Sequence, residues 1–292
     1  MKYKLLITML WLTSKLPLAI THFICFVVGN ALYITPNKLK RVSKINIDLC
    51  FQQESSQFKK HLLRKSLIEQ CKSILELGPL WLWPIDKLLA LVKEIHGIEP
   101  LEACLLRKQG LFAATPHLGA WELCGLVGSS RYPFTAMYRP PRIAELEPWI
   151  IGARERAGAK LVDFGRQGLK EMIRALKSGE VVGILPDQEP RDIGGVFVPF
   201  FGVPAFTMTL ISKMARKSNA AVFFATMERL PWGRGYRLII REAEPGITSD
   251  DEIIATTALN QSIEACVRAC PEQYIWSYRR FKQRPEGSPP LY

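Results

Sequence analysis

From Val92 onward the chain alternates short apolar runs with segments of helical periodicity, and this alternation constrains the fold more than any other feature. Breaker-bounded apolar runs of about four to eight residues are typical of buried strands. Strands that alternate with helices build layered α/β domains. We therefore expect a mixed, largely parallel sheet flanked by helices. The runs predicted as strands are 92–96, 111–115, 134–138, 160–163, 181–185, 220–227 and 236–240.

Helices are expected between most of these strands, and no internal repeat or low-complexity linker divides the region. Three acidic residues stand at the start of the last helix, where the helix dipole favours negative charge. Residues 92–292 are therefore predicted to form one domain. The predicted helices are 99–108, 119–129, 143–157, 167–178, 207–217 and 250–269.

The N-terminal segment 5–34 is almost free of charge, with Lys15 as its only charged residue. About 20 apolar residues are needed to span a bilayer core, and the uncharged stretch 16–34 is close to that length. No Ala-x-Ala-like cleavage site follows it, which argues against a secretory signal peptide. We predict that 1–36 is a membrane anchor with a hydrophobic helix. Pro17 and His22 leave a buried or interfacial helix as the alternative.

The chain is both basic and apolar: its formal net charge is +12 and 48% of its residues are hydrophobic. This combination indicates an anionic membrane surface or an acidic protein partner. Zinc-finger spacing and RNA-binding aromatic signatures are absent from the sequence, so no nucleic-acid partner is expected. Basic residues after the apolar segment exceed those before it, which favours a cytoplasmic location for the rest of the chain. They are Lys38, Lys40, Arg41 and Lys44, against Lys2 and Lys4.

Residues 37–91 are predicted to form a helical, basic and amphipathic segment between the anchor and the α/β domain. Apolar periodicity predicts helices over 37–50 and 55–77. The stretch 78–84 (GPLWLWP) is predicted to be an interfacial aromatic anchor or ordinary core packing.

The seven cysteines form neither a Cys-x-x-Cys pair nor a Cys/His cluster. An odd number without framework spacing is typical of structural thiols in a reducing compartment. We expect no metal site and no cofactor.

His117 and Glu122 stand where a predicted strand turns into a predicted helix. Pro116 ends the strand, so His117 lies in the turn and Glu122 in the first turn of the helix, from which it could reach back. A carboxylate that accepts a hydrogen bond from one imidazole nitrogen makes the other a better base. A capped helix with a satisfied histidine is the structural alternative. Cys124 is predicted to point away from Glu122, so we expect direct transfer to a hydroxyl without a covalent intermediate.

Arg139 and Asp187 also follow predicted strands. Ligands of parallel α/β sheets collect beyond the carboxyl ends of the strands, so both side chains are expected on the same edge as His117. Arg139 is suited to an oxyanion or an anionic acceptor group. Asp187 is expected to orient a neighbouring group or to pair with a basic residue. For each, a structural ion pair is the alternative.

Several blocks of the sequence resemble the bacterial lipid A biosynthesis acyltransferase family, the late lauroyl and myristoyl transferases. The similarity covers nearly the whole chain, and the blocks stand in the family's order. The wider glycerolipid acyltransferase superfamily usually has His-x4-Asp and Phe-Pro-Glu-Gly-Thr, where this chain has Glu122 and Leu-Pro-Asp-Gln. This departure argues against glycerol 3-phosphate as the acceptor. The blocks are 117–122, 137–140, 183–188, 195–205, 276–282 and 284–287.

The resemblance implies a glycerolipid acyltransferase-like fold and transfer of an acyl chain to a hydroxyl of a lipid A precursor of the Kdo-lipid IVA type. The implied donor is an acyl carrier protein thioester, and the implied location is the cytoplasmic face of the inner membrane. Residues 92–292 would be the catalytic domain, with His117 as general base and Glu122 as its orienting carboxylate. Another lipid acceptor, such as a lysophospholipid or an aminolipid, and a non-catalytic lipid-binding module are the alternatives.

Three phenylalanines follow Gly194-Gly195 in a breaker-framed apolar run. The resemblance implies that this run flanks the active site, where it could line an acyl pocket. An inner hydrophobic loop packed against the sheet is the alternative. The acyl-pocket candidates are Phe197, Phe200 and Phe201.

Overall fold

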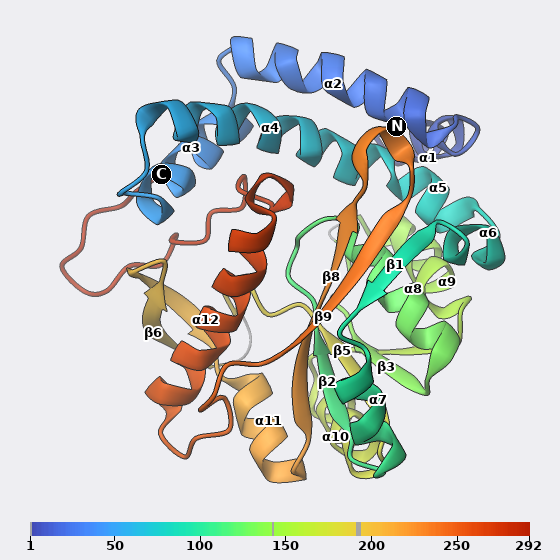
Figure 1. The fold of residues 1–292 in the computed structure, drawn as a ribbon, viewed down its shortest axis with the longest axis vertical. Coiled ribbons are helices and arrows are strands. Elements are labelled where there is room, and N and C mark those ends of the chain that lie inside the picture. The colour runs from blue at the N-terminus through green and yellow to red at the C-terminus, as the bar shows by residue number, and fades with distance from the viewer. Residues whose placement is uncertain (1, 142, 191–193) are drawn as a thin grey trace.

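The computed structural model describes residues 2–141, 143–190 and 194–292 and has a seven-stranded sheet at its centre (Figure 1). The strand order is β1-β9-β8-β2-β5-β3-β4. All neighbouring strands are parallel except β8 and β9, which form an antiparallel pair. The expected mixed, largely parallel α/β sheet is therefore confirmed. The strands are β1 (Val92–His96), β2 (Leu111–Ala114), β3 (Phe134–Met137), β4 (Ala159–Val162), β5 (Val181–Ile184), β8 (Ala221–Arg229) and β9 (Tyr236–Glu242).

The central strand β2 shows why an apolar run becomes a strand here. It is hydrogen-bonded to β5 on one side and β8 on the other, and all four of its residues are buried. Successive side chains of a strand point to opposite faces of the sheet. Leu111 and Ala113 pack into one hydrophobic cluster, and Phe112 and Ala114 into the other. A strand buried on both faces needs a continuous apolar run.

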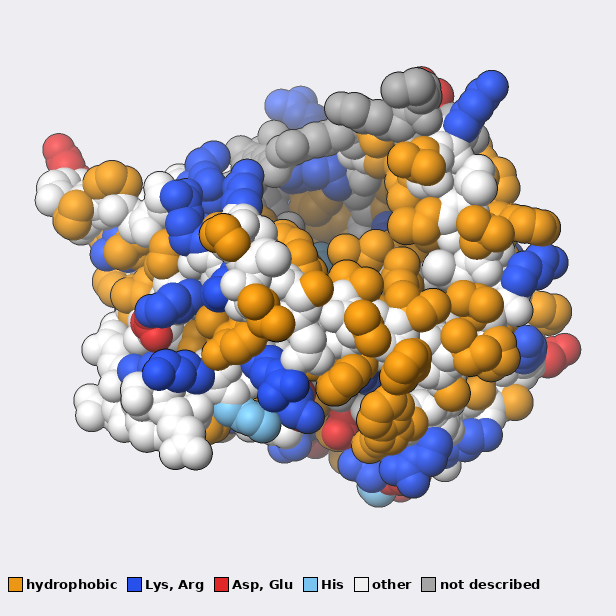
Figure 2. Space-filling model, turned by 90° about the horizontal axis from the view of Figure 1, so that it is seen from above, with side chains coloured by type: hydrophobic (Ala, Val, Ile, Leu, Met, Phe, Trp, Pro, Cys, Tyr) orange, Lys and Arg blue, Asp and Glu red, His pale blue; other side chains and the backbone are white. Residues whose placement is uncertain are grey.

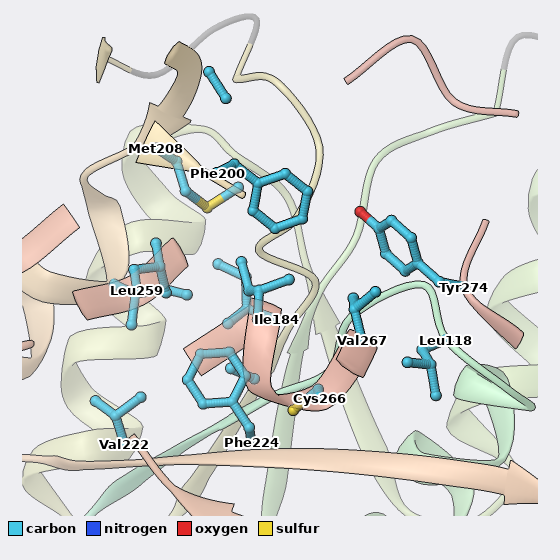
Figure 3. Packing of buried hydrophobic residues seen from close by; sticks show 14 of the residues in the cluster. Leu118, Ile184, Phe200, Met208, Val222, Phe224, Leu259, Cys266, Val267 and Tyr274 are labelled. Atoms are coloured by element: carbon cyan, nitrogen blue, oxygen red, sulfur yellow. The ribbon is translucent and has the colours of Figure 1, made fainter. Parts of the chain in front are cut away.

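Helices cover both faces of the sheet. The Leu111 side packs against α7 (Glu99–Leu106) and α8 (Trp121–Arg131). The Phe112 side packs against α10 (Arg166–Lys177), α11 (Leu210–Ser218) and α12 (Glu252–Ala269). Figure 3 shows this second layer, where Leu259 of α12 and Val222 and Phe224 of β8 belong to one buried cluster. α9 (Glu147–Glu155) contacts α8 and β4.

A two-stranded antiparallel hairpin, β6 (Gly195–Phe200) and β7 (Val203–Met208), contains the run with three phenylalanines. The sequence did not predict these strands. Phe200 and Phe201 are buried in an aromatic cluster with Tyr274 and Trp276. Phe197 instead lies against Phe206, with ring centroids 5.2 Å apart. Phe200 and Phe201 therefore pack inside the protein, whereas Phe197 is only partly buried.

The apolar N-terminal segment is two helices rather than one: α1 (Lys2–Ser14) and α2 (Leu18–Ile34). Pro17 immediately precedes α2, and proline disfavours a helical conformation of the residue before it. Among the described residues, no single helix is long and apolar enough to cross a membrane. Only α2 and α3 (Lys38–Cys50) together have the length and composition, and their axes are bent by 79°. The expected continuous membrane-anchoring helix is therefore unconfirmed.

Helix α2 lies alongside α4 (Ser56–Leu75) across one end of the molecule (Figure 1). The remaining helices of this region are the short α5 (Leu77–Leu82) and α6 (Ile85–Leu89). Three buried side chains connect α2 to the rest of the protein, and we call His22, Glu76 and Arg229 the N-terminal ion cluster. Glu76 Oε1 lies 2.7 Å from His22 Nε2, and its Oε2 accepts a hydrogen bond of 2.6 Å from Arg229 Nε.

Burial of Glu76 raises its pKa, but the adjacent Arg229 and His22 more than offset this and hold the pKa below its usual range. The carboxyl is therefore ionised inside the protein. Because Arg229 belongs to β8, the cluster joins the first apolar segment to the central sheet.

Candidate active site

His117 lies in the turn between β2 and α8, which tertiary contacts hold in place. The carbonyl of His117 accepts a hydrogen bond from the backbone N–H of Ile275. Gly119 has φ +61°, and a Cβ at this position would lie 2.0 Å from the carbonyl oxygen of Met227. Only glycine fits such a close approach at positive φ. The turn therefore presents the His117 side chain, 17% exposed, in a fixed position.

The carboxylate that contacts His117 is Asp187, which follows β5. The His117 Nδ1 and Asp187 Oδ1 atoms are 2.8 Å apart, and the backbone N–H of His117 donates to Asp187 Oδ2 at 3.0 Å. A carboxylate at Nδ1 favours the tautomer with the proton on Nδ1, which leaves the lone pair on Nε2. The amide nitrogen of Gln188 lies 3.2 Å from Nε2.

Asp187 is 1% exposed. Burial raises its pKa, but His117 and the hydrogen bonds from that residue's ring and backbone outweigh burial and hold the pKa below the usual range. An ionised buried carboxylate stabilises the imidazolium that forms when His117 takes up a proton. The pair therefore has the arrangement of a general base and its positioning residue.

The structure places Glu122, the carboxylate expected to orient His117, in a different contact. Arg154 of α9 donates to both of its carboxylate oxygens, through Nε at 3.0 Å and through Nη2. Glu122 lies in the first turn of α8, which begins at Trp121. Its contact with Arg154 joins this turn to α9. Asp187 instead enters from β5, directly beside β2.

The Glu122 side chain is 9% exposed and that of Arg154 is 31% exposed. Burial raises the pKa of Glu122, but Arg154 more than offsets it, and the nearby His117 lowers the pKa further. The pair is therefore ionic. Sequence analysis did not identify Arg154, because nothing in the spacing of α9 marks its partner on α8.

Arg139 follows β3, which is the neighbour of β5 in the sheet. Because β2, β5 and β3 are parallel, the residues after them lie at one edge, as the sequence predicted for His117, Asp187 and Arg139. The guanidinium carbon of Arg139 lies 4.8 Å from the centroid of the Phe164 ring. This contact keeps a permanent cation at the edge of the sheet that carries His117.

A largely apolar cavity lies between α8 and the sheet. At the carboxyl edge of the sheet its walls include Thr115, Trp121, Glu122 and Arg154. Farther in, small residues of three neighbouring strands and one face of α8 line it. The sequence analysis did not identify this cavity. The signal that could have found it is a small residue at the position that faces α8 in each of three strands: Ala113, Ala136 and Gly183.

The thiol of Cys124, which lines the same cavity, is buried, and burial raises its pKa to about 12. A neutral thiol is a poor nucleophile. Within residues 2–141, 143–190 and 194–292, no group of three His, Cys, Asp or Glu side chains is arranged to hold a metal ion.

Comparisons with known proteins support the resemblance noted in the sequence. The family model for bacterial lipid A biosynthesis acyltransferases matches residues 2–283. The chain is 34% identical to the lipid A biosynthesis lauroyltransferase of Escherichia coli K12 over 291 residues, which cover 98% of the chain and 93% of that protein. It is 31% identical to the palmitoleoyltransferase over 284 residues (97% and 92%) and 24% identical to the myristoyltransferase over 252 residues (85% and 76%), both from the same organism.

Proposed function

The chain belongs to the bacterial lipid A biosynthesis acyltransferase family and is an acyltransferase, and we propose that it moves a fatty acyl chain from an acyl carrier protein thioester to a hydroxyl of a lipid A precursor of the Kdo-lipid IVA type. The observation that carries the proposal is the His117–Asp187 pair at the edge of the sheet, next to an apolar cavity. The net charge of +12 supports an acidic carrier protein as donor, because opposite charges speed association.

In the proposed reaction, Nε2 of His117 takes the proton of the acceptor hydroxyl as its oxygen attacks the thioester carbonyl carbon. The C–O bond forms, and the carbonyl electrons move onto an oxyanion. When the carbonyl re-forms, the C–S bond breaks, and the leaving thiolate takes the proton from His117. Asp187 stabilises the imidazolium between these steps. No bond to the enzyme forms.

Glu122 and Arg139 have supporting roles in this proposal. Glu122, in the first turn of the helix that follows His117, adds negative charge on this side of the site. Arg154 keeps Glu122 ionised and fixed. Arg139 supplies positive charge at the same edge, for the oxyanion or for an anionic group of the acceptor.

The direct test is acyl transfer by the purified protein. With a lauroyl, myristoyl or palmitoleoyl carrier protein thioester and Kdo-lipid IVA, we expect mass spectrometry to show the mass of one added acyl chain. Parallel incubations with a lysophospholipid and an aminolipid test the other acceptors. Transfer to one of these but not to Kdo-lipid IVA would leave the acyltransferase reaction in place and contradict the acceptor. No transfer to any acceptor would contradict the enzymatic proposal.

We also propose that the protein works at the cytoplasmic side of the inner membrane, with α1 and α2 against the lipid. Seen from above, hydrophobic side chains gather on this end of the molecule with Lys and Arg side chains around them (Figure 2). We call this surface the N-terminal apolar face. A monomer seldom exposes so many large apolar side chains together. The face is made of Leu5, Trp11, Leu12, Ile20, Phe23, Ile24, Phe26, Val27, Val28 and Trp232.

Replacing Phe23 and Val27 together by serine should weaken membrane binding. Both side chains are more than half exposed, at 58% and 53%. Losing their contact with lipid should cost about 2 kcal/mol, or roughly 30-fold in vesicle binding. The measurement is flotation with vesicles that contain anionic lipid. Leu106→Ser, at a more exposed position (86%) on α7, is the control. Unchanged flotation of the double variant would show that α2 is not the lipid contact.

A further inference from the structure

The floor of the cavity under α8 is a row of small residues in the sheet. Ala113 of β2 pairs in register with Gly183 of β5, and Gly183 pairs with Ala136 of β3. All three line the cavity. Three small residues side by side on adjacent strands leave a shallow trough in the sheet surface, and the ring of Phe134 closes it over Gly183.

Helix α8 forms the opposite wall of the cavity. At Gly125 no side chain projects from this wall. Positions 122, 125 and 128 are three apart, so they lie on one face of the helix, and all three line the cavity. A Cβ added at Gly125 would meet no heavy atom within 4 Å in the described part of the chain. A Cβ at Gly128 would lie 2.6 Å from the ring of Phe134. The space is therefore empty at Gly125 and filled by Phe134 one turn later.

The cavity begins where the reaction is proposed to occur. Trp121, Glu122 and Arg154 form its wall at the carboxyl edge of the sheet, and the ring centroid of Trp121 lies 5.3 Å from that of His117. The interior surface is mainly apolar. An unbranched alkyl chain matches such a surface because it has no polar group to satisfy. A thioester with its carbonyl at His117 would place its alkyl tail between α8 and the trough.

We propose that this cavity holds the acyl chain of the donor and that Gly125 controls how much of the chain it admits. The proposal rests on the acyltransferase function proposed above. A side chain at 125 would occupy the path between Glu122 and Phe134. Phe134 forms the next barrier, since its ring lies against both Gly128 and Gly183. A larger side chain at 125 should favour shorter acyl chains, and a smaller side chain at 134 should favour longer ones.

Gly125→Ala and Gly125→Leu are the variants that shorten the cavity. Alanine is the better helix former, so the first variant should fold at least as well as the wild type. Each buried methylene contributes a factor of about four in affinity. For Gly125→Leu we expect the ratio of kcat/KM for a C12 donor to that for a C8 donor to fall by at least about tenfold, with a smaller fall for Gly125→Ala. Phe134→Leu should shift the preference to longer chains.

The matched control is Gly152→Leu on α9, an exposed glycine whose added Cβ would likewise meet no described heavy atom within 4 Å. It does not line the cavity, so its chain-length ratio should equal that of the wild type. Thermal melting of every variant separates a change in preference from unfolding. An unchanged C12 to C8 ratio in folded Gly125→Leu would overturn the proposal.

A second readout needs no turnover. A pantetheine thioester whose acyl chain carries a terminal diazirine is photolysed with the wild-type protein, and labelled peptides are mapped by mass spectrometry. Labels on α8 or on β2, β3 and β5 are expected. Labels confined to the β6–β7 hairpin would overturn the cavity assignment. Labelling of the cavity without acyl transfer to any acceptor would keep the site and contradict the proposed function.

Discussion

Replacing His117 by alanine is expected to lower the rate of acyl transfer by about 10²- to 10⁴-fold, the usual effect of losing a positioned general base. The fold should survive, because the turn is held by backbone contacts of Gly119 and Ile275. Initial rates with a carrier protein thioester, together with a thermal melt, measure both effects. His96→Ala, which removes an exposed histidine on β1, is the control. Wild-type turnover in folded His117→Ala would eliminate His117 as the general base of this reaction.

The companion variants compare the two carboxylates. Asp187→Asn can still accept a hydrogen bond from His117 Nδ1, but it carries no charge to stabilise the imidazolium. Glu122→Gln leaves the His117–Asp187 contact intact; it removes a negative charge and the ionic pair with Arg154. We therefore expect a larger loss of kcat for Asp187→Asn than for Glu122→Gln. The reverse order would favour Glu122 as the positioning residue, as the sequence suggested.

Replacing Arg229 by methionine is expected to lower the free energy of unfolding by about 3–5 kcal/mol, because Glu76 would remain as a buried charge without its cation. Arg229 and Glu76 are both almost completely buried. Urea denaturation measures the effect. Arg237→Met, which removes a partly exposed ion pair with Glu94, is the control and should change stability little.

A double variant that combines Glu76→Gln with Arg229→Met tests why Arg229→Met lowers the free energy of unfolding. If an uncompensated charge destabilises Arg229→Met, the double variant should be more stable than the single one. Because the folded-state pKa of Glu76 is lowered, the cluster stabilises the protein above the ordinary carboxyl pKa, and this contribution is lost as the pH falls through the folded-state pKa. A double variant as unstable as Arg229→Met would show that lost packing, not charge, dominates.

The sheet was predictable from sequence because its strands are short, continuous apolar runs between breakers. The run 111–115 became β2, and the run 181–185 became β5. The hairpin β6–β7 was not predictable in this way, because two of its residues, Pro199 and Pro204, cannot donate to a ladder. Antiparallel pairing of β8 with β9 depends on a short connection through Trp232 that carries no periodic signal.

The sequence predicted the edge of the sheet at which the site lies, but it did not predict which side chains contact each other there. His117, Arg139 and Asp187 each follow a strand, and parallel pairing brings such residues to one edge. Which carboxylate touches His117 depends on strand order, which places β5 next to β2 although Asp187 is 70 residues away along the chain. Local spacing therefore pointed to Glu122. Arg154, which binds Glu122, comes from α9 and had no sequence signal.

The N-terminal ion cluster also has a consequence for synthesis on the ribosome. His22 is translated before Arg229, which follows 207 residues later (229 minus 22). At about 5–20 residues per second, the wait is roughly 10 to 40 s. During that interval Arg229 is not yet present to bind Glu76, so the contact that joins α2 to the sheet cannot form. The apolar side chains of α2 are exposed until another surface covers them. Early contact of the growing chain with lipid or with a chaperone would cover that surface until β8 completes the cluster.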